Sequence, residues 1–580
     1  MTRIILNYAI LAGLIYGAGE FLGWPVLENL GYAIRATFWD WAPRVGIPMD
    51  QAEIWWGWVA SKFPAGFPVW GIILTLLCGL SLALRAFVTL PMGKIIGRAL
   101  KGALWALKLI VLIPYALIRR KMLVRRSPFG KAKWAKLRDL KREGLLKSGG
   151  LFLGQFRKSW RYRYDLFHHG DGHFITIAGT GGGKTTACLI PPLLTAKSGS
   201  FIVTDPKGQI SAITRRYRAT KGRVFFLNPF YADFAAATGL DYQDSGFNPF
   251  DMIENGENTL AQSDILAKFL LAPDGKAGRS FFDLEAASFL SLFIAWVARH
   301  EPPENRNLCH LYRLMHDSPE MTLQHMLHVN DEQLMGGAFK YLSLFKNMAA
   351  AAQWQGVVNT ADQALTRYVP GTPLGRHVEK SGFDPALLKS EDVTVYVILP
   401  SQHIRTGSQW LNMVLGMLGD AVGRPGKSRP VTMLLDELPN LGFLPDLRAQ
   451  MRQFREYGLR MWLFSQTVGA LRDIYGPDGI EDIFGLCDTM QFFAIREFKQ
   501  AEAVSKMVGD MARLNRSQST ANEQDSISTV GVPLISANEI LRLPKTQQII
   551  IRRGLPIKAR LIPYFKRWGW RRRTERNPYR

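Results

Sequence analysis

Residues 174–190 read FITIAGTGGGKTTACLI. An apolar, β-rich run leads into a glycine-rich turn, which ends in Lys184 and Thr185 before a second apolar stretch. This order matches the phosphate-binding loop Gly-x4-Gly-Lys-Ser/Thr, except that Ala178 stands at the first glycine position. The stretch therefore predicts a strand, a phosphate-binding loop and a helix of an α/β nucleotide-binding domain.

The glycine-rich turn supplies groups that can hold a triphosphate. Its glycines let backbone amides turn inward toward phosphate oxygens, Lys184 reaches the β- and γ-phosphates, and the Thr185 hydroxyl ligates Mg²⁺. We expect ATP and Mg²⁺ as cofactors, held by Ala178, Gly179, Thr180, Gly181, Gly182, Gly183, Lys184, Thr185 and Thr186. The alternative is a glycine-rich turn without a ligand. Pro191 and Pro192 must end or kink the following helix early.

A second strand tip carries two carboxylates. Residues 431–435 read VTMLL, which is typical of a strand buried on both faces of a parallel sheet, and Asp436 and Glu437 follow. Because ligands bind at the carboxyl ends of strands in such sheets, we expect both side chains to face the nucleotide. Asp436 would hold hydrated Mg²⁺, and Glu437 would orient and polarise the attacking water.

Downstream residues leave two roles open. Arg448, Arg452 and Arg455 recur at helical spacing. They form either a solvated basic face or a row across a subunit boundary, from which one arginine reaches a neighbour's γ-phosphate. Residues 460–464 read as the next strand, and Gln466 at its tip either senses the γ-phosphate or caps the strand.

Length and composition indicate a folded chain of more than one domain. The chain has 580 residues, of which 47% are hydrophobic and 21% are charged, and this composition excludes wholesale disorder. The four cysteines have no Cys-x-x-Cys spacing, which argues against a disulfide framework and against a zinc site.

The amino-terminal part predicts a membrane anchor. Two apolar stretches, at about 4–24 and 67–90, approach the length of transmembrane helices. Residues 92–147 hold 16 Lys and Arg against two acids, so the positive-inside rule places the large carboxyl-terminal part in the cytoplasm. The apolar stretch 103–118 is an interfacial amphipathic helix or a third span, and we favour the former.

Further motifs follow in order along most of the chain. They read GKAKWAKLRDLKREGLL (130–146), LFLGQF (151–156), FIVTDPKGQ (201–209), VFFLNPF (224–230), FNPFDMI (247–253), DVTVYVILP (392–400), LLDELPNLGFLPDL (434–447) and PLISANEILRLPKTQQIII (533–551). In this order the chain resembles the type IV secretion coupling proteins, the membrane ATPases of bacterial conjugation of the TraG/TraD kind. Cell-division DNA pumps share only the core motifs.

The resemblance implies an α/β fold: a RecA-like P-loop ATPase domain with an inserted all-α domain, preceded by two transmembrane helices. The implied parts are a membrane anchor at 1–127 with a basic interfacial segment, the RecA-like domain at 128–255 and 391–580, and the inserted domain at 256–390. It also implies a homo-hexameric ring. Arg455 matches the arginine that acts across the subunit boundary, and Gln466 matches the strand-tip glutamine. Gln209 departs from the family's Asp-Pro-Lys-Gly-Glu motif.

The implied function is that of an ATPase in the bacterial inner membrane, with Lys184, Glu437, Arg455 and Gln466 as its catalytic residues. It would couple relaxase-bound single-stranded DNA, and protein substrates, to a type IV secretion channel during conjugation. The implied partners are single-stranded DNA, relaxosome proteins, channel proteins and inner-membrane lipid. The alternative is an ATP-gated receptor that recruits protein effectors to the channel without pumping DNA.

Two further segments are predicted to be disordered or flexible from their composition. The basic tail beyond Tyr564, FKRWGWRRRTERNPYR, is either a solvated disordered end or a contact for DNA phosphates. Residues 515–530, NRSQSTANEQDSISTV, are expected to form a polar flexible loop.

Overall fold

The computed structural model describes residues 130–271, 281–426, 429–518 and 525–579. The chain divides into two compact units, one of Gly130–Met511 with Gly531–Arg580 and the other of Met1–Phe129 with Ala512–Val530. Both predicted membrane spans lie outside the described residues. Within the described part of the chain, no helix is both long and apolar enough to cross a bilayer.

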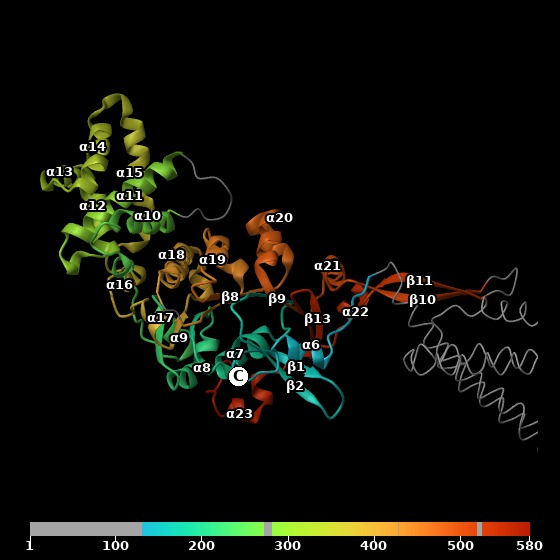
Figure 1. Ribbon diagram of the computed structural model, residues 1–580. Coiled ribbons are helices and arrows are strands. Elements are labelled where there is room, and N and C mark those ends of the chain that lie inside the picture. The colour runs from blue at the N-terminus through green and yellow to red at the C-terminus, as the bar shows by residue number, and fades with distance from the viewer. Residues whose placement is uncertain (1–129, 272–280, 427–428, 519–524, 580) are drawn as a thin grey trace, which may run out of the picture. The chain divides into compact units, whose positions relative to one another are not determined.

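The larger unit is built on one eleven-stranded sheet (Figure 1). In spatial order its strands are β2 (Arg163–His168), β1 (Leu151–Arg157), β13 (Leu555–Arg560), β12 (Gln547–Arg552), β9 (Cys487–Phe493), β3 (His173–Ala178), β8 (Leu459–Ser465), β7 (Val431–Leu435), β4 (Ser200–Thr204), β6 (Val393–Val397) and β5 (Arg223–Leu227). From β9 to β5 all neighbours run parallel. From β9 to β2 all neighbours run antiparallel.

Side chains of the central strands alternate between two apolar cores. In β8, Met461 and Leu463 pack into one core, whereas Trp462 and Phe464 pack into the other. This alternation follows from the two-residue period of a strand, and it requires helices on both faces of the sheet. The mixed α/β class expected from the sequence is thus confirmed.

Helices cover both faces of the parallel strands. One face carries α7 (Ile190–Thr195) and α8 (Gln209–Ala219), and the other carries α18 (Ile404–Gly423), α19 (Leu447–Gln453) and α20 (Val468–Leu486). The remaining helices of the sheet region are α6 (Leu137–Arg142), α21 (Phe498–Val508), α22 (Ala537–Leu541) and α23 (Trp568–Arg571). A π-helical turn, Thr185–Leu189, precedes α7, and Pro191 and Pro192 lie in the first turn of α7, where proline is tolerated.

Between β5 and β6 the described residues form helices and no strand. These helices are α9 (Tyr231–Thr238), α10 (Thr259–Leu270), α11 (Phe281–His300), α12 (Leu308–Asp317), α13 (Pro319–Val329), α14 (Glu332–Lys346), α15 (Ala351–Leu365), α16 (Pro373–Val378) and α17 (Leu387–Ser390). Most of them gather at one end of the unit (Figure 1). The boundaries predicted for the inserted domain, residues 256–390, stay a prediction.

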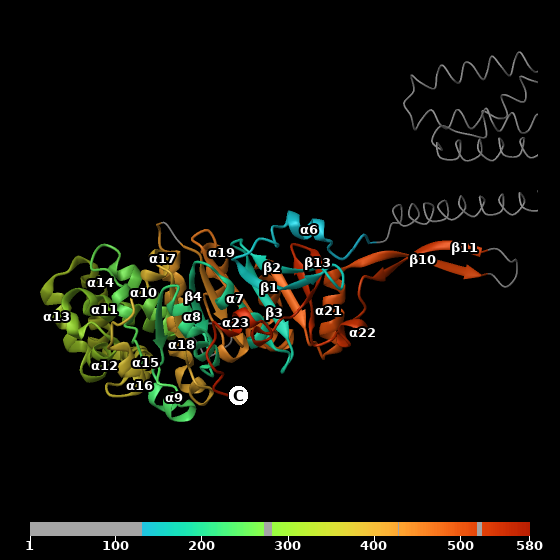
Figure 2. The same cartoon turned by 90° about the horizontal axis from the view of Figure 1, so that it is seen from below.

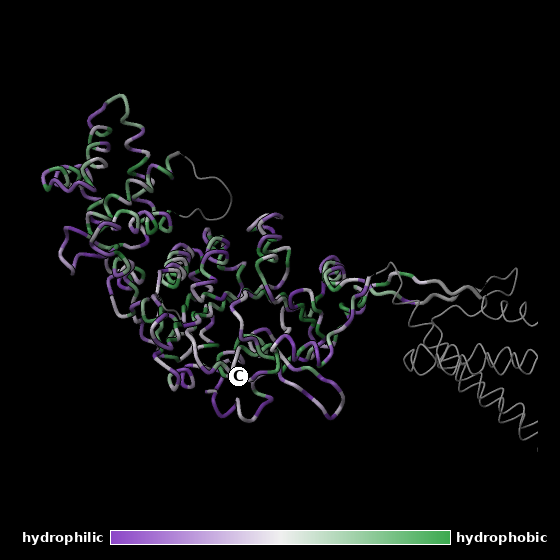
Figure 3. Tube along the Cα trace, in the orientation of Figure 1, coloured by the Kyte–Doolittle hydropathy of each residue, from purple (hydrophilic) through white to green (hydrophobic). Residues whose placement is uncertain are grey.

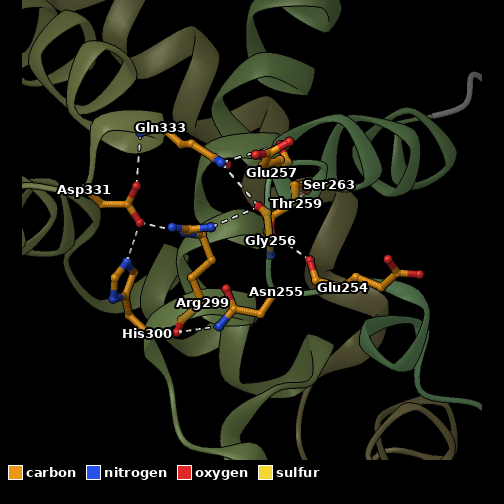
Figure 4. Close-up of polar contacts among 10 residues, drawn as sticks. All are labelled: Glu254, Asn255, Gly256, Glu257, Thr259, Ser263, Arg299, His300, Asp331 and Gln333. Atoms are coloured by element: carbon orange, nitrogen blue, oxygen red, sulfur yellow. Dashed lines mark hydrogen bonds and ion pairs between the residues drawn. The ribbon is translucent and has the colours of Figure 1, made fainter.

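A cluster of polar side chains connects three parts of this helical segment: the end of α11, the start of α14 and the residues before α10 (Figure 4). Asp331 caps α14 by accepting a 3.0 Å hydrogen bond from the Gln333 amide. Its other oxygen lies 2.6 Å from Arg299 Nε and 2.8 Å from His300 Nε2 at the end of α11. Arg299 also donates to the Gly256 carbonyl ahead of α10. Burial opposes ionisation of Asp331, but the hydrogen bonds from His300 and Arg299 hold its pKa below the usual range.

The carboxyl-terminal tail is folded, and the expectation of a disordered end is wrong. Trp570 is buried against Phe152 of β1, with ring centroids 4.9 Å apart. Arg567 pairs with Asp165 of β2 at 2.5 Å. Viewed from below, α23 lies on the α7 side of the sheet (Figure 2). The tail folds because its aromatic residues find apolar partners on a hairpin far away in sequence, which local composition does not reveal.

The expected polar loop at 515–530 is also wrong for most of its length. β10 (Asp510–Gln518) and β11 (Asp525–Pro533) pair as a two-stranded sheet. β-branched residues at 527, 529, 530 and 532 favour the extended backbone of the second strand, and this preference outweighs the polar composition of the segment.

Candidate nucleotide-binding site

The glycine-rich turn leaves the carboxyl end of β3 and enters the π-helical turn before α7. Gly181 and Gly183 adopt positive φ angles of 72° and 90°, a region that side chains disfavour. The Gly182 amide donates to the Gly179 carbonyl at 3.0 Å. Ala178 ends β3 without a positive φ, so this position needs no glycine here, and the departure from the usual motif leaves the loop geometry intact.

Four of the predicted side chains form one hydrogen-bonded chain at this edge of the sheet. Lys184 Nζ lies 2.5 Å from Glu437 Oε1. The other oxygen of Glu437 accepts from Gln466 Nε2 at 3.2 Å. Thr180 Oγ1 then donates to Gln466 Oε1 at 2.6 Å. The structure thus brings together the tips of three parallel strands: β3 before the loop, β7 before Glu437 and β8 before Gln466.

The Lys184–Glu437 pair is shielded from solvent. The Lys184 side chain is 9% exposed and that of Glu437 is 22% exposed. Glu437 has a left-handed backbone, with φ of 53°, which turns its carboxylate back toward the loop. Strained conformations of this kind are common at functional sites. An ammonium group has three N–H donors, and Lys184 uses one of them on Glu437.

Asp436 is a buried carboxyl group beside this chain. Its backbone amide donates to Thr204 Oγ1 at 2.8 Å, while its Oδ1 atom has no hydrogen-bond partner among the described residues. Burial, reinforced by the Glu437 charge, raises the pKa of Asp436 to about 7. A buried, unpartnered carboxyl oxygen fits a ligand of a hydrated Mg²⁺ ion. Thr185, expected as the second ligand, begins the turn that follows Lys184.

Asp205 has a structural role at the next strand tip. Its Oδ2 atom accepts a 2.7 Å hydrogen bond from the Ser211 amide in the first turn of α8. Gly208 precedes this helix with a φ of 62°. Burial raises the pKa of Asp205. The DPKGQ motif therefore builds a strand-to-helix turn, and Gln209, the departure from the family pattern, is the first residue of α8.

Arg455 lies away from these residues, at the opposite edge of the sheet. It follows the end of α19 and precedes β8, whereas the phosphate-binding loop follows the end of the parallel strand β3. Its Nη2 atom lies 3.0 Å from Asp171 and 3.4 Å from Asp488, and the hydrogen bond that it donates to Asp171 raises the pKa of the guanidinium group. Within one chain, Arg455 therefore does not contribute to the nucleotide site.

The helical face predicted for the three arginines is only partly observed. α19 ends at Gln453, so Arg455 belongs to the turn after the helix. Arg448 and Arg452 both pair with Asp482 of α20. The spacing predicted one row of three arginines because the helix was expected to continue past Gln453, where it ends.

Arg496 belongs to the site but was not predicted from the sequence. This residue follows β9, the other parallel neighbour of β3, and its Nη2 atom donates to the Thr180 carbonyl at 3.4 Å. The sequence does carry a signal for this residue. An arginine that follows the carboxyl end of a parallel strand lies at the edge of the sheet where ligands bind.

The parallel sheet, the glycine-rich loop and the two carboxylates at a neighbouring strand tip define a RecA-like P-loop protein. Residues 133–578 match the family described as type IV secretory system conjugative DNA transfer, and the chain belongs to that family.

Two relatives illustrate the similarity within this family. The chain is 23% identical over 584 residues to the type IV secretion system-coupling protein VirD4 of Bartonella henselae, covering 92% of this chain and 84% of that protein. It is 27% identical over 404 residues to the conjugal transfer protein TraG of Rhizobium radiobacter, covering 67% of this chain and 61% of that protein.

Solved structures share the fold. The plasmid coupling protein TrwB in complex with ADP and Mg²⁺ superposes with a TM-score of 0.52 at 16% identity, covering 75% of this chain and 96% of that chain. TrwB in complex with the ATP analogue ADPNP gives the same TM-score. At this level of identity the likeness shows the fold alone.

Proposed function

We propose that this chain is the coupling ATPase of a conjugative type IV secretion system, anchored in the bacterial inner membrane. It connects relaxase-bound single-stranded DNA, with protein substrates, to the secretion channel. The observation that carries the proposal is the hydrogen-bonded chain of Lys184, Glu437, Gln466 and Thr180 on a phosphate-binding loop. Family membership supports the role in DNA transfer.

The residues of the site fit ATP and Mg²⁺. The loop amides of 179–184 and the Lys184 ammonium would bind the phosphates, and Asp436 with Thr185 would hold the hydrated metal ion. Bound Mg²⁺ would neutralise charge that develops on the phosphate oxygens. Lys184 is paired with Glu437 in the structure.

Partner exchange at Lys184 links nucleotide binding to catalysis. When the ammonium turns to a phosphate, the Glu437 carboxylate loses its cation and gains the freedom to accept a proton from water. Gln466 lies 3.2 Å from Glu437 and 2.6 Å from Thr180, so its amide positions both the carboxylate and the loop. General-base assistance of this kind contributes roughly 10²–10⁴-fold to a rate.

Arg455 supports a ring as the active form. It lies at the sheet edge opposite to the loop, so it could reach a γ-phosphate only in a neighbouring subunit. We propose a homo-hexamer in which Arg455 of one subunit approaches the γ-phosphate bound by the next. Such an arginine contributes about 10³–10⁵-fold to turnover.

The test measures ATP hydrolysis by the full-length chain in lipid nanodiscs, with and without single-stranded DNA. We expect DNA to raise the rate and Lys184→Ala to abolish it. Mixing Arg455→Ala with the unaltered chain should reduce activity by more than the fraction of altered subunits, because each altered subunit disables a neighbour.

Absence of a DNA response, together with nucleotide-dependent affinity for partner proteins, would replace the motor with an ATP-gated receptor. A strictly proportional loss on mixing would refute the role of Arg455 across the boundary.

A further inference from the structure

The loop between β1 and β2 exposes aromatic and basic side chains together. Residues 157–163 read RKSWRYR, which holds four basic residues and no acid. Trp160 is 67% exposed and Tyr162 is 60% exposed. The loop is ordered by its own hydrogen bonds, since the Lys158 amide donates to the Tyr162 carbonyl at 3.0 Å. Tryptophan and tyrosine are enriched at interfaces and at membrane surfaces, where one end of the ring is in apolar surroundings and the other is in water.

The carboxyl-terminal tail presents a second set of the same kind. Residues 566–573 read KRWGWRRR, again without an acid. Trp568 is 68% exposed, and the Arg572 guanidinium lies 3.7 Å from the centroid of its ring. On the β1–β2 loop, Arg161 lies in the same way 4.5 Å from the Trp160 ring.

The tail set is fastened to the two strands that carry the loop set. Arg567, next to Trp568, bonds both oxygens of Asp165 on β2, and Trp570 packs against Phe152 of β1. The β1–β2 loop and α23 lie at the same end of the unit, away from the helical segment, and both are coloured mainly as hydrophilic (Figures 1 and 3). The hairpin–tail surface is defined by Lys158, Trp160, Arg161, Tyr162, Trp568 and Arg572.

Its shape and chemistry favour a bilayer surface over a nucleic acid. A single strand is usually tracked along a groove, with bases stacked on free aromatic faces. Here one face of each tryptophan already carries an arginine, and the β1–β2 loop is a turn between two strands. Tryptophan and tyrosine prefer the headgroup level of a membrane, and each Lys or Arg near an anionic surface strengthens attachment by about fivefold.

We propose that the hairpin–tail surface docks the nucleotide-binding unit onto anionic phospholipid headgroups. This inference rests on the membrane location given under the proposed function. The predicted membrane anchor, residues 1–127, precedes this unit along the chain, which favours a bilayer as the anionic partner. A second attachment of this kind would fix the orientation of the unit relative to the membrane.

The experiment places a fluorophore on the β1–β2 loop of the full-length chain. Cys188, Cys309 and Cys487 are buried, so labelling needs only Cys78→Ser and Ser159→Cys. The chain is reconstituted in nanodiscs of phosphatidylcholine alone or mixed with phosphatidylglycerol, each containing a headgroup-nitroxide lipid as quencher. We expect quenching in the anionic discs to be several-fold stronger than in the neutral discs.

Charge reversal supplies the matched comparison. Lys158→Glu with Arg161→Glu should lower quenching in anionic discs to the level of neutral discs. Arg313→Glu with Lys346→Glu makes the same change on exposed residues of α12 and α14 and should leave quenching unchanged. Equal quenching in both disc types, or no response to the first pair, would overturn the proposal. So would single-stranded DNA that protects the label as well as the anionic lipid does.

Failure of the anchor would be seen separately. A chain that does not co-elute with the discs refutes the membrane location. In that case flotation with vesicles of the same two compositions becomes the readout. The hairpin–tail surface must then still bind the anionic vesicles, and the Lys158–Arg161 charge reversal must release them. Binding that ignores this reversal would refute the docking role.

Discussion

Replacing Glu437 by glutamine separates the two roles that the structure gives to this carboxylate. Glu437 lies 2.5 Å from the nearly buried Lys184 and neutralises its charge. Glutamine keeps an oxygen acceptor but loses the charge, so the loss is that of a charge-assisted hydrogen bond, about 1–3 kcal/mol. We therefore expect a lower melting temperature without nucleotide.

The same change should strengthen ATP binding. The phosphates no longer compete with a carboxylate for Lys184, and if the full loss appears in binding, the dissociation constant falls about 5- to 150-fold. Hydrolysis should fall by roughly 10²–10⁴-fold, because a glutamine cannot accept the proton of water. Tight binding without turnover is the expected signature of Glu437→Gln.

Three measurements on the full-length chain check this prediction: thermal melting, titration with a fluorescent ATP analogue, and phosphate release. Glu391→Gln is the matched control. Its exposed pair with Arg223, at 2.9 Å, should contribute only about 0–1 kcal/mol and should affect neither binding nor turnover. Weaker ATP binding by Glu437→Gln, or turnover at the unaltered rate, would refute the proposed partner exchange.

Three further predictions follow from other buried groups. Because the pKa of Asp436 is raised to about 7, Mg²⁺-dependent nucleotide binding should weaken as the pH falls through 7. Asp436→Asn should abolish this pH dependence and should stabilise the chain at pH 8 in the absence of nucleotide. Binding titrations and melting curves at several pH values test both effects. Asp331→Asn should destabilise the helical segment by about 1–3 kcal/mol at neutral pH. In the unaltered chain, the contribution of Asp331 to the free energy of unfolding should vanish as the pH falls through its lowered pKa. Melting curves at several pH values measure both effects. Trp570→Ala should cost about 3–5 kcal/mol, whereas Trp568→Ala should cost almost nothing, as measured by melting.

The strand tips of the nucleotide site could be read from the sequence because each is a local signal. An apolar run ending in Gly-Lys-Thr, in Asp-Glu or in Ser-Gln places those residues at the ligand edge of a parallel sheet, whatever the rest of the chain does. The meeting of Lys184, Glu437 and Gln466 then follows from strand adjacency. β3, β8 and β7 are neighbours in that order.

Contacts between distant segments could not be read in this way. Trp570 is buried only because β1 supplies Phe152, and nothing in the basic tail indicates that partner. Arg455 pairs with Asp171, just before β3, and with Asp488, at the start of β9. Helical spacing instead predicted that Arg455 lies on a helix face, but α19 ends before this residue. The antiparallel half of the sheet depends likewise on pairing between β1 and β13, which are far apart along the chain.

The two cations assigned to the triphosphate share one feature that the sequence did not suggest. Lys184 is paired with Glu437, and Arg455 is paired with Asp171 and Asp488, so carboxylates hold both cations. Each cation is thereby positioned without leaving an unpaired charge near low-dielectric surroundings. In the proposed ring, each cation would exchange an acid for a phosphate, Lys184 within its own subunit and Arg455 across a boundary. A nucleotide that drove both exchanges would link loop occupancy to contact between neighbouring subunits, which is the coupling that the proposed ring requires.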